Sequence, residues 1–143
     1  MSAHVPDFSG TWVVVPSRSV WVHDGNPINI TVFGERFTAE QTPQTLSIAI
    51  DNERGFKWIY RLDGAASTNA VPIGSRQELT FSSVAWHDKT LHITTTVSVT
   101  SAGASGQPEL RRTIRFNDDG TLRVEASWGP NRTMIGSVYS RQR

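Results

Sequence analysis

The sequence contains no cysteine, which excludes a disulfide framework, a thiolate nucleophile and any zinc or iron–sulfur site built on cysteine. No apolar run approaches the roughly 20 residues of a membrane-spanning helix, and no charged-then-apolar leader opens the chain. We therefore expect a soluble protein without a membrane span. Its compartment stays open, because a cytoplasmic protein and an exported mature domain without its leader would share these features.

The chain also lacks an excess of charge of one sign. Fourteen Lys and Arg residues face thirteen Asp and Glu residues, which leaves a formal net charge of +1. A protein that binds nucleic acid through the phosphate backbone needs an extended positive field. We therefore expect no nucleic-acid partner.

Known catalytic motifs are missing as well. The sequence has no Gly-x-Ser-x-Gly elbow, no phosphate-binding loop and no dinucleotide fingerprint. None of the four histidines shows metal-ligand spacing, because His87 and His92 lie five residues apart across a predicted turn. The sequence thus predicts no metal site and no cofactor.

What the sequence does contain is alternation of apolar and polar residues with period two, repeated between turn residues from end to end. Helical periodicity is nearly absent. The 143 residues have the size of one domain, so residues 1–143 are predicted to form a single all-β domain. The predicted strands are 10–15, 35–41, 45–51, 56–62, 77–86, 90–100, 108–116, 121–128 and 133–140.

Short turns such as Asp118-Asp119-Gly120 predict that consecutive strands pair as hairpins. A meander without crossover helices must split into two sheets or close on itself, and we expect an up-and-down antiparallel β-barrel of about 8–10 strands. Nine strands cannot all close antiparallel, so one count is wrong or residues 18–33 supply another strand. Residues 18–33 are predicted to be an irregular lid or an extra hairpin, and residues 63–76 and 101–107 to be longer connections.

Alternation also predicts which side chains point inward, since residues two apart share one face of a strand. The inward candidates are Trp12, Val14, Leu46, Ile48, Ile50, Phe56, Trp58, Tyr60, Leu62, Leu79, Phe81, Leu91, Ile93, Val97, Val99, Leu122, Val124, Ala126 and Trp128. One polar residue breaks this pattern, because Arg112 shares its face with Leu110 and Ile114.

A buried guanidinium needs a partner, since an unpaired buried charge costs several kcal/mol. Arg112 is therefore the first candidate ligand-binding residue, offering donors to a carboxylate, phosphate or carbonyl. Tyr60 and Tyr139 would add hydroxyl groups, and Trp58 an apolar wall. The alternatives are a paired structural arginine, a register slip that places Arg112 outside, and aromatic residues that only fill the core.

Three short segments resemble known families. Phe8-Ser9-Gly10-Thr11-Trp12 is similar to the N-terminal Gly-x-Trp signature of lipocalins and related calycins, and to the start of small bacterial lipocalin-like domains. Trp86-His87-Asp88-Lys89-Thr90-Leu91 and the ending from Asp119 onward resemble hairpins of intracellular lipid-binding proteins, whose last strand carries an Arg-x-Tyr pair for a ligand carboxylate. The matching place here reads Ser137-Val138-Tyr139. The resemblance implies a calycin-like barrel with Trp12 across its closed end.

An up-and-down order places the 18–33 segment and the turns at Asn52–Gly55, His87-Asp88 and Asp118-Asp119 on one rim, opposite Trp12. There, the pairs His23-Asp24 and His87-Asp88 are candidate acid–base groups, since a histidine beside a carboxylate can titrate near neutrality. The alternative is that these Asp residues only cap turn backbone. His92 shares its face with threonines and is expected on the solvent side.

Three functions are compatible with these features. The first is binding of a small, largely apolar or amphipathic molecule inside the barrel, with Arg112 and Tyr60 or Tyr139 fixing its polar end. The second is a cofactor-free barrel enzyme, such as a lyase, isomerase, cyclase or hydrolase, that uses the acid–base groups at the barrel mouth. The third is a filled barrel that acts as an interaction domain.

Overall fold

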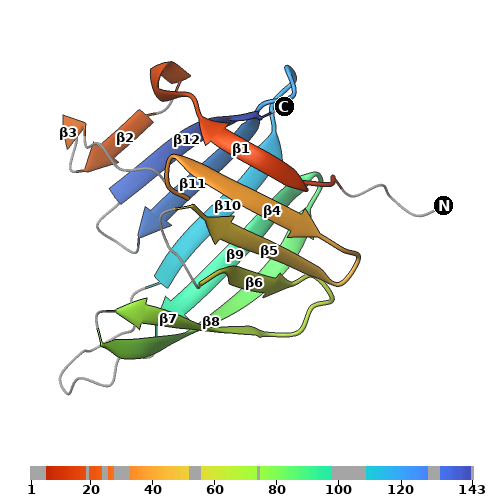
Figure 1. Ribbon diagram of the computed structural model, residues 1–143, viewed down its shortest axis with the longest axis vertical. Coiled ribbons are helices and arrows are strands. Elements are labelled where there is room, and N and C mark those ends of the chain that lie inside the picture. Colours follow the sequence, from red (N-terminus) through yellow and green to blue (C-terminus); the bar gives the residue numbers. More distant parts are fainter. Residues whose placement is uncertain are drawn as a thin grey trace.

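A computed structural model of the chain describes residues 6–18, 20–23, 26–27, 33–51, 56–73, 75–97, 109–128 and 133–142. Within these residues the chain forms twelve strands and one short 3-10 helix, and ten of the strands follow one antiparallel hydrogen-bonded path (Figure 1). The ten are β1 (Gly10–Val14), β4 (Arg36–Gln41), β5 (Thr45–Ile50), β6 (Trp58–Arg61), β7 (Ser67–Ile73), β8 (Arg76–His87), β9 (Thr90–Val97), β10 (Glu109–Phe116), β11 (Leu122–Trp128) and β12 (Thr133–Arg141). The spatial order is β6-β5-β4-β1-β12-β11-β10-β9-β8-β7. The prediction of an all-β, up-and-down antiparallel barrel is confirmed.

The strand that the sequence analysis missed is β7, which lies in the stretch 63–76 that was predicted to be a connection. Its inward side chains include the buried Ser67 and Asn69, so the segment does not show the usual apolar-in, polar-out alternation. Adding β7 to the nine predicted strands gives ten, an even number that can close antiparallel.

Residues 18–33 contribute two short strands outside the barrel path. These are β2 (Val20–His23), which pairs with β12, and β3 (Asn26–Pro27), which pairs with β2. A 3-10 helix, η1 (Pro16–Arg18), separates β1 from β2. The additional barrel strand therefore comes from β7 and not from this segment.

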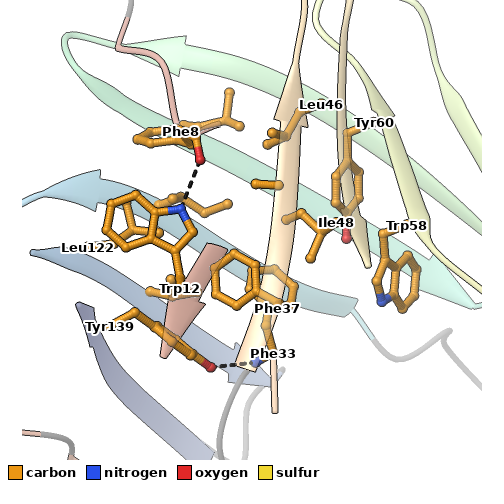
Figure 2. Packing of buried hydrophobic residues seen from close by; sticks show 14 of the residues in the cluster. Phe8, Trp12, Phe33, Phe37, Leu46, Ile48, Trp58, Tyr60, Leu122 and Tyr139 are labelled. Carbon is orange, nitrogen blue, oxygen red and sulfur yellow. Dashed lines mark hydrogen bonds between the residues drawn. The ribbon is translucent and has the colours of Figure 1, made fainter. Parts of the chain in front are cut away.

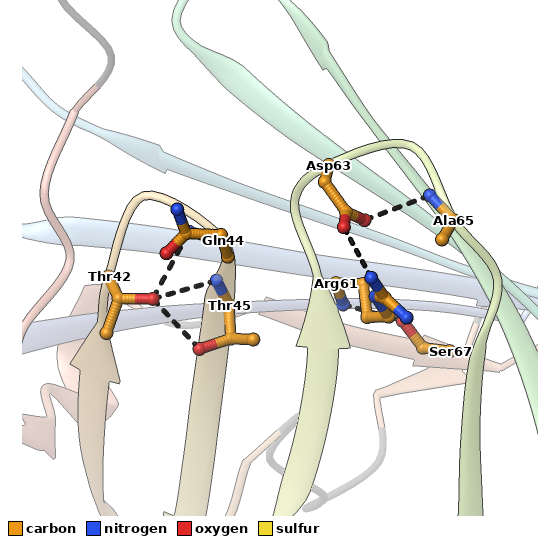
Figure 3. A network of polar contacts seen from close by, with 7 residues as sticks. All are labelled: Thr42, Gln44, Thr45, Arg61, Asp63, Ala65 and Ser67. Carbon is orange, nitrogen blue, oxygen red and sulfur yellow. Dashed lines mark hydrogen bonds and ion pairs between the residues drawn. The ribbon is translucent and has the colours of Figure 1, made fainter.

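The barrel is closed by side chains, because β6 and β7 stand at the two ends of the backbone-paired path. The Asn69 amide bridges both backbone groups of Ile59: its Oδ1 accepts from the Ile59 N–H at 2.9 Å, and its Nδ2 donates to the Ile59 carbonyl at 3.0 Å. Near the adjoining turn, the Ser67 hydroxyl accepts from the Arg61 N–H at 2.6 Å (Figure 3). The seam between β6 and β7 is thus held by two polar side chains that replace backbone partners.

Aromatic residues fill the end of the barrel at which β1 begins. The Trp12 indole is fully buried and donates to the Phe8 carbonyl at 2.9 Å (Figure 2). The Phe8 ring stacks on Trp86 with ring centres 5.7 Å apart, and Phe116 lies 5.9 Å from Trp12. These contacts join the start of β1 to the ends of β8 and β10.

Arg141 covers Trp12 from the last strand. Its guanidinium carbon lies 4.4 Å from the Trp12 ring centre, and its Nη1 donates to the Ser9 carbonyl at 2.6 Å. Gly10 permits this approach, because it has a φ of +141° and a Cβ atom at that position would lie 2.5 Å from Arg141 Nη1. The Gly-x-Trp motif therefore has a geometric reason in this chain: the glycine leaves room for the cation that packs on the tryptophan.

The prediction of inward side chains is wrong for Leu79 and Phe81 of β8 and confirmed for the candidates whose burial the structure describes on the other strands. The side chains of Val97, Val99 and Trp128 lie outside the described residues. Leu79 and Phe81 point outward and are 47% and 42% exposed. The inward face of β8 is instead formed by Thr80, Ser82, Val84 and Trp86. Side chains two residues apart share one face of a strand. Because Val84 and Trp86 pack against the core, the odd-numbered Leu79 and Phe81 point outward.

Asp119 fixes the turn between β10 and β11. Hydrogen bonds from the Thr121 hydroxyl and the Thr121 N–H, together with the ion pair to Arg18, lower the pKa of Asp119 to about 2. A depressed carboxyl pKa stabilises the fold above the unfolded-state pKa, and the stabilisation is lost as the pH falls through the folded-state pKa.

We therefore expect Asp119→Asn to unfold at lower urea concentration than the wild type at pH 6, and the difference to shrink as the pH falls from about 4 to about 2. Urea unfolding across this pH range measures it. Asp118→Asn, in the same exposed turn, is the matched control. A difference between Asp119→Asn and wild type that is the same at pH 6 and pH 2 would contradict the assignment.

None of the described residues forms a helix long and apolar enough to cross a membrane.

Candidate functional site

The candidate site is built around Arg112, in the middle of β10. Arg112 pairs with Ile93 of β9 and Ala126 of β11, whose side chains are both buried. Its neighbour two residues on, Ile114, belongs to the core cluster. Arg112 therefore lies on the inner face of the sheet, as the alternation of residues along its strand predicted.

The Arg112 side chain reaches across the interior to β6. Its Nη1 donates to the Tyr60 hydroxyl oxygen at 2.9 Å. Its guanidinium carbon lies 4.8 Å from the centre of the Trp58 ring and 5.3 Å from the centre of the Phe33 ring. Both distances allow cation–π attraction, which replaces part of the lost hydration of the cation. The structure thus brings Arg112, Tyr60 and Trp58 together, as the sequence analysis proposed.

The hydrogen-bonding capacity of Arg112 is only partly used. Its Nε is buried and has no hydrogen-bond partner, and within the described ranges no Asp or Glu forms an ion pair with this guanidinium. Arg123 also has a buried Nε without a partner, but that side chain pairs with Glu125 at 3.4 Å. A guanidinium carries five N–H donors, so Arg112 keeps both a charge and donors for a further acceptor.

Tyr60 presents a neutral phenol to the same place. Burial raises the pKa of its hydroxyl, and the nearby Arg112 cation only partly opposes this increase. The hydroxyl oxygen accepts from Arg112, whereas its own proton has no acceptor within the described part of the chain. The Trp58 ring stacks parallel to Tyr60, with ring centres 5.9 Å apart and an angle of 3° between the planes. Tyr60 can therefore donate to a group that also accepts from Arg112.

Tyr139 has a different role from the one the sequence analysis gave it. Its hydroxyl accepts from the Phe33 N–H at 3.0 Å (Figure 2). The same hydroxyl donates to the Gly34 carbonyl at 2.7 Å. The hydroxyl therefore anchors the backbone of residues 33–34 and is not free for a ligand. Through this anchor Tyr139 holds Phe33, whose ring faces Arg112.

Phe33 is the residue of the site that sequence reasoning missed. It ends the irregular 18–33 segment, outside any strand, so period-two alternation gave it no direction. The contact depends on Tyr139, more than a hundred positions away in the chain.

One wall of the interior is polar but satisfied. Ser82 of β8 and Thr95 of β9 are both buried, and their hydroxyl groups lie 2.8 Å apart. The Thr80 hydroxyl donates to the Asn69 carbonyl at 3.2 Å. These groups satisfy one another, whereas Arg112 Nε and the Tyr60 hydroxyl proton have no acceptor within the described residues.

The candidate pair His87-Asp88 does not lie opposite Trp12. The turn at His87-Asp88 follows Trp86, whose ring stacks on Phe8, and the turn at Asp118-Asp119 follows Phe116, whose ring packs on Trp12. Both turns therefore lie at the end that Trp12 occupies, and the predicted position opposite Trp12 is wrong. The missed strand β7 is the reason: β1 and β4 pair antiparallel as expected, and the additional strand between β6 and β8 reverses the end at which the later hairpin turns lie.

His87 faces outward from β8, and both His87 and Asp88 are exposed, so they face solvent and not Arg112. His92 is on the solvent side, as predicted. Asp24 and the side chain of His23 lie outside the described residues, and their acid–base role stays a prediction. Within the described part of the chain, no three His, Cys, Asp or Glu side chains come close enough to hold a metal ion.

Comparison with known proteins does not assign the chain to a family. No protein-family model matches it, and no curated protein matches it either. The function is therefore inferred from the geometry around Arg112.

Proposed function

We propose that this barrel binds a small, largely apolar or amphipathic molecule, and that an acidic or other acceptor group of this ligand pairs with Arg112 and Tyr60. The observation that carries the proposal is the charged Arg112 side chain inside the barrel, with a buried Nε that lacks a partner. The likeness of the N-terminal and mid-chain motifs to lipocalins and lipid-binding proteins supports a calycin-like carrier of this kind.

The surroundings of Arg112 favour an anionic group over a neutral one. A guanidinium keeps its charge at physiological pH, and the described part of the chain supplies aromatic faces rather than a carboxylate as its neighbours. A ligand carboxylate would accept from the free donors of Arg112 and from the Tyr60 hydroxyl at once. Trp58, Phe33 and the core residues beyond them would contact its apolar part.

The test compares apolar carboxylic acids with their methyl esters, which have the same carbon skeleton without the charge. Thermal shifts and native mass spectrometry would first select an acid that binds the wild type. We expect Arg112→Leu to weaken binding of that acid by roughly 10- to 100-fold, the effect of losing a charge-assisted hydrogen bond. Tyr60→Phe should weaken binding by roughly 3- to 10-fold, because one neutral donor is lost.

Arg115→Leu is the matched control, because Arg115 lies on the same strand but is exposed on the outer face. It should leave the affinity unchanged. The stability of Arg112→Leu should stay within about 1 kcal/mol of the wild type, since replacing an under-partnered buried charge by an apolar residue is often neutral. If no acid binds the wild type, or if Arg112→Leu binds acids as tightly as the control, the proposal fails.

A further inference from the structure

The hairpin of β8 and β9 brings two histidines together on the outer face of the barrel. His87 pairs with Thr90 in the last rung of the ladder, and His92 pairs with Ala85. The two imidazoles are therefore diagonal neighbours on antiparallel strands, a placement that lets long side chains meet. Their ring centres lie 5.9 Å apart, and their planes are nearly perpendicular, at 86°.

The backbone beneath the pair is firmly held. β8 and β9 pair continuously from Thr80↔Val97 to His87↔Thr90, and β9 is also paired with β10 along its other side. Asp88 closes the turn with a φ of 57°, a left-handed conformation that Asp tolerates better than most residues. Both histidines are exposed, so their ring nitrogens can be reached from solvent.

We propose that His87 and His92 form a surface site for a divalent late transition-metal ion, with water completing the coordination. Imidazole nitrogen is a preferred ligand for such ions. Two imidazoles on one ion have ring centres about 5 Å apart, because each nitrogen lies about 2 Å from the metal. The observed ring centres are 5.9 Å apart, so binding requires side-chain rotations that bring the two rings closer. By the usual order of metal affinities, Cu²⁺ binds more tightly than Zn²⁺ at this site.

Spacing along the chain does not reveal this pair, since the two residues are five apart and meet only through the hairpin register. The site is open, because no third protein ligand joins the pair within the described residues. It lies on the outer face, whereas the site at Arg112 faces the interior, so the two proposals succeed or fail separately.

The experiment uses untagged protein in which His4 and His23 are replaced by alanine, so that His87 and His92 are the only histidines. Calorimetric titration with Cu²⁺ and with Zn²⁺ should show one ion bound per chain, Cu²⁺ more tightly. Adding His87→Ala or His92→Ala should weaken Cu²⁺ binding by roughly 10-fold or more, because one of the two protein ligands is lost and even the loss of an outer-shell partner of a ligand costs about 10- to 100-fold. Lys89→Ala, in the exposed turn between the strands, should leave the affinity unchanged.

Nuclear magnetic resonance locates the bound Cu²⁺ ion without relying on the measured affinity. Substoichiometric Cu²⁺ is paramagnetic and should broaden amide signals of the β8–β9 hairpin around His87 and His92 first. If the protein that keeps only His87 and His92 binds no metal ion, the proposal is overturned and the contact between the two rings is packing alone. Binding that persists in both alanine variants, or broadening centred elsewhere, would also overturn it.

Discussion

Replacing Trp12 by alanine is expected to lower the free energy of unfolding by about 3–5 kcal/mol, as for other large aromatic residues removed from a core. The indole is fully buried, and it also donates to the Phe8 carbonyl and carries Arg141 on its face. Alanine would therefore leave a cavity at the end of the barrel and release two segments that the ring holds. Urea unfolding followed by circular dichroism would measure the change.

Trp12→Phe separates the hydrogen bond of the indole N–H from the apolar packing of the ring. Phenylalanine keeps most of the apolar contact but lacks the N–H donor, so a smaller loss of about 1–2 kcal/mol is expected. An alanine variant that loses less than about 1 kcal/mol would show that Trp12 does not hold this end.

Asn69→Leu is expected to open the seam between β6 and β7 and to cost about 2–4 kcal/mol of unfolding free energy. Leucine has nearly the shape of asparagine but leaves the Ile59 N–H and carbonyl without the partners that Asn69 supplies. An unsatisfied backbone group costs about 1–3 kcal/mol when buried, and less where solvent can reach it. Hydrogen exchange at the Ile59 amide should accelerate more than exchange in the β4–β5 ladder.

The control for the seam is Thr68→Val. Thr68 neighbours Asn69 on β7 but is exposed on the outer face, so its replacement should change stability by no more than about 0.5 kcal/mol. If Asn69→Leu behaves like this control and the Ile59 amide stays protected, side-chain bridges do not close the barrel.

The seam and the proposed site are connected through β6. Ile59 and Arg61, whose backbone groups Asn69 and Ser67 satisfy, flank Tyr60 on both sides. Tyr60 is the hydrogen-bond partner of Arg112. The position of the Tyr60 ring thus depends on whether the two ends of the sheet stay joined, which links barrel closure to the geometry around Arg112.

The alternation of apolar and polar residues within short segments was sufficient to predict most strands of the barrel. All nine predicted strands are present, because their alternating apolar residues have only one arrangement that buries one face of each strand. The turns between them contain residues that accept tight-turn geometry, such as Gly120 with a φ of 86°. The inward direction of Arg112 followed from the same alternation.

Local pattern failed where interior positions are polar. The buried residues Ser67 and Asn69 concealed β7, because their hydrogen bonds are made to another strand and leave no apolar signal in the sequence. The apolar Leu79 and Phe81 suggested the wrong face for β8 for the opposite reason. In both cases, contacts with neighbouring strands decide which side chains of the strand point inward.

The sequence by itself determined the all-β class, the pairing of consecutive strands as hairpins and the inward direction of Arg112, because these depend on residues close together in the chain. Tertiary structure alone decided that Arg112 meets Tyr60, Trp58 and Phe33, that Tyr139 anchors Phe33, and that His87 meets His92. These contacts depend on strand register and on barrel closure. Both are set by the packing of all ten strands together, which no short segment of sequence encodes.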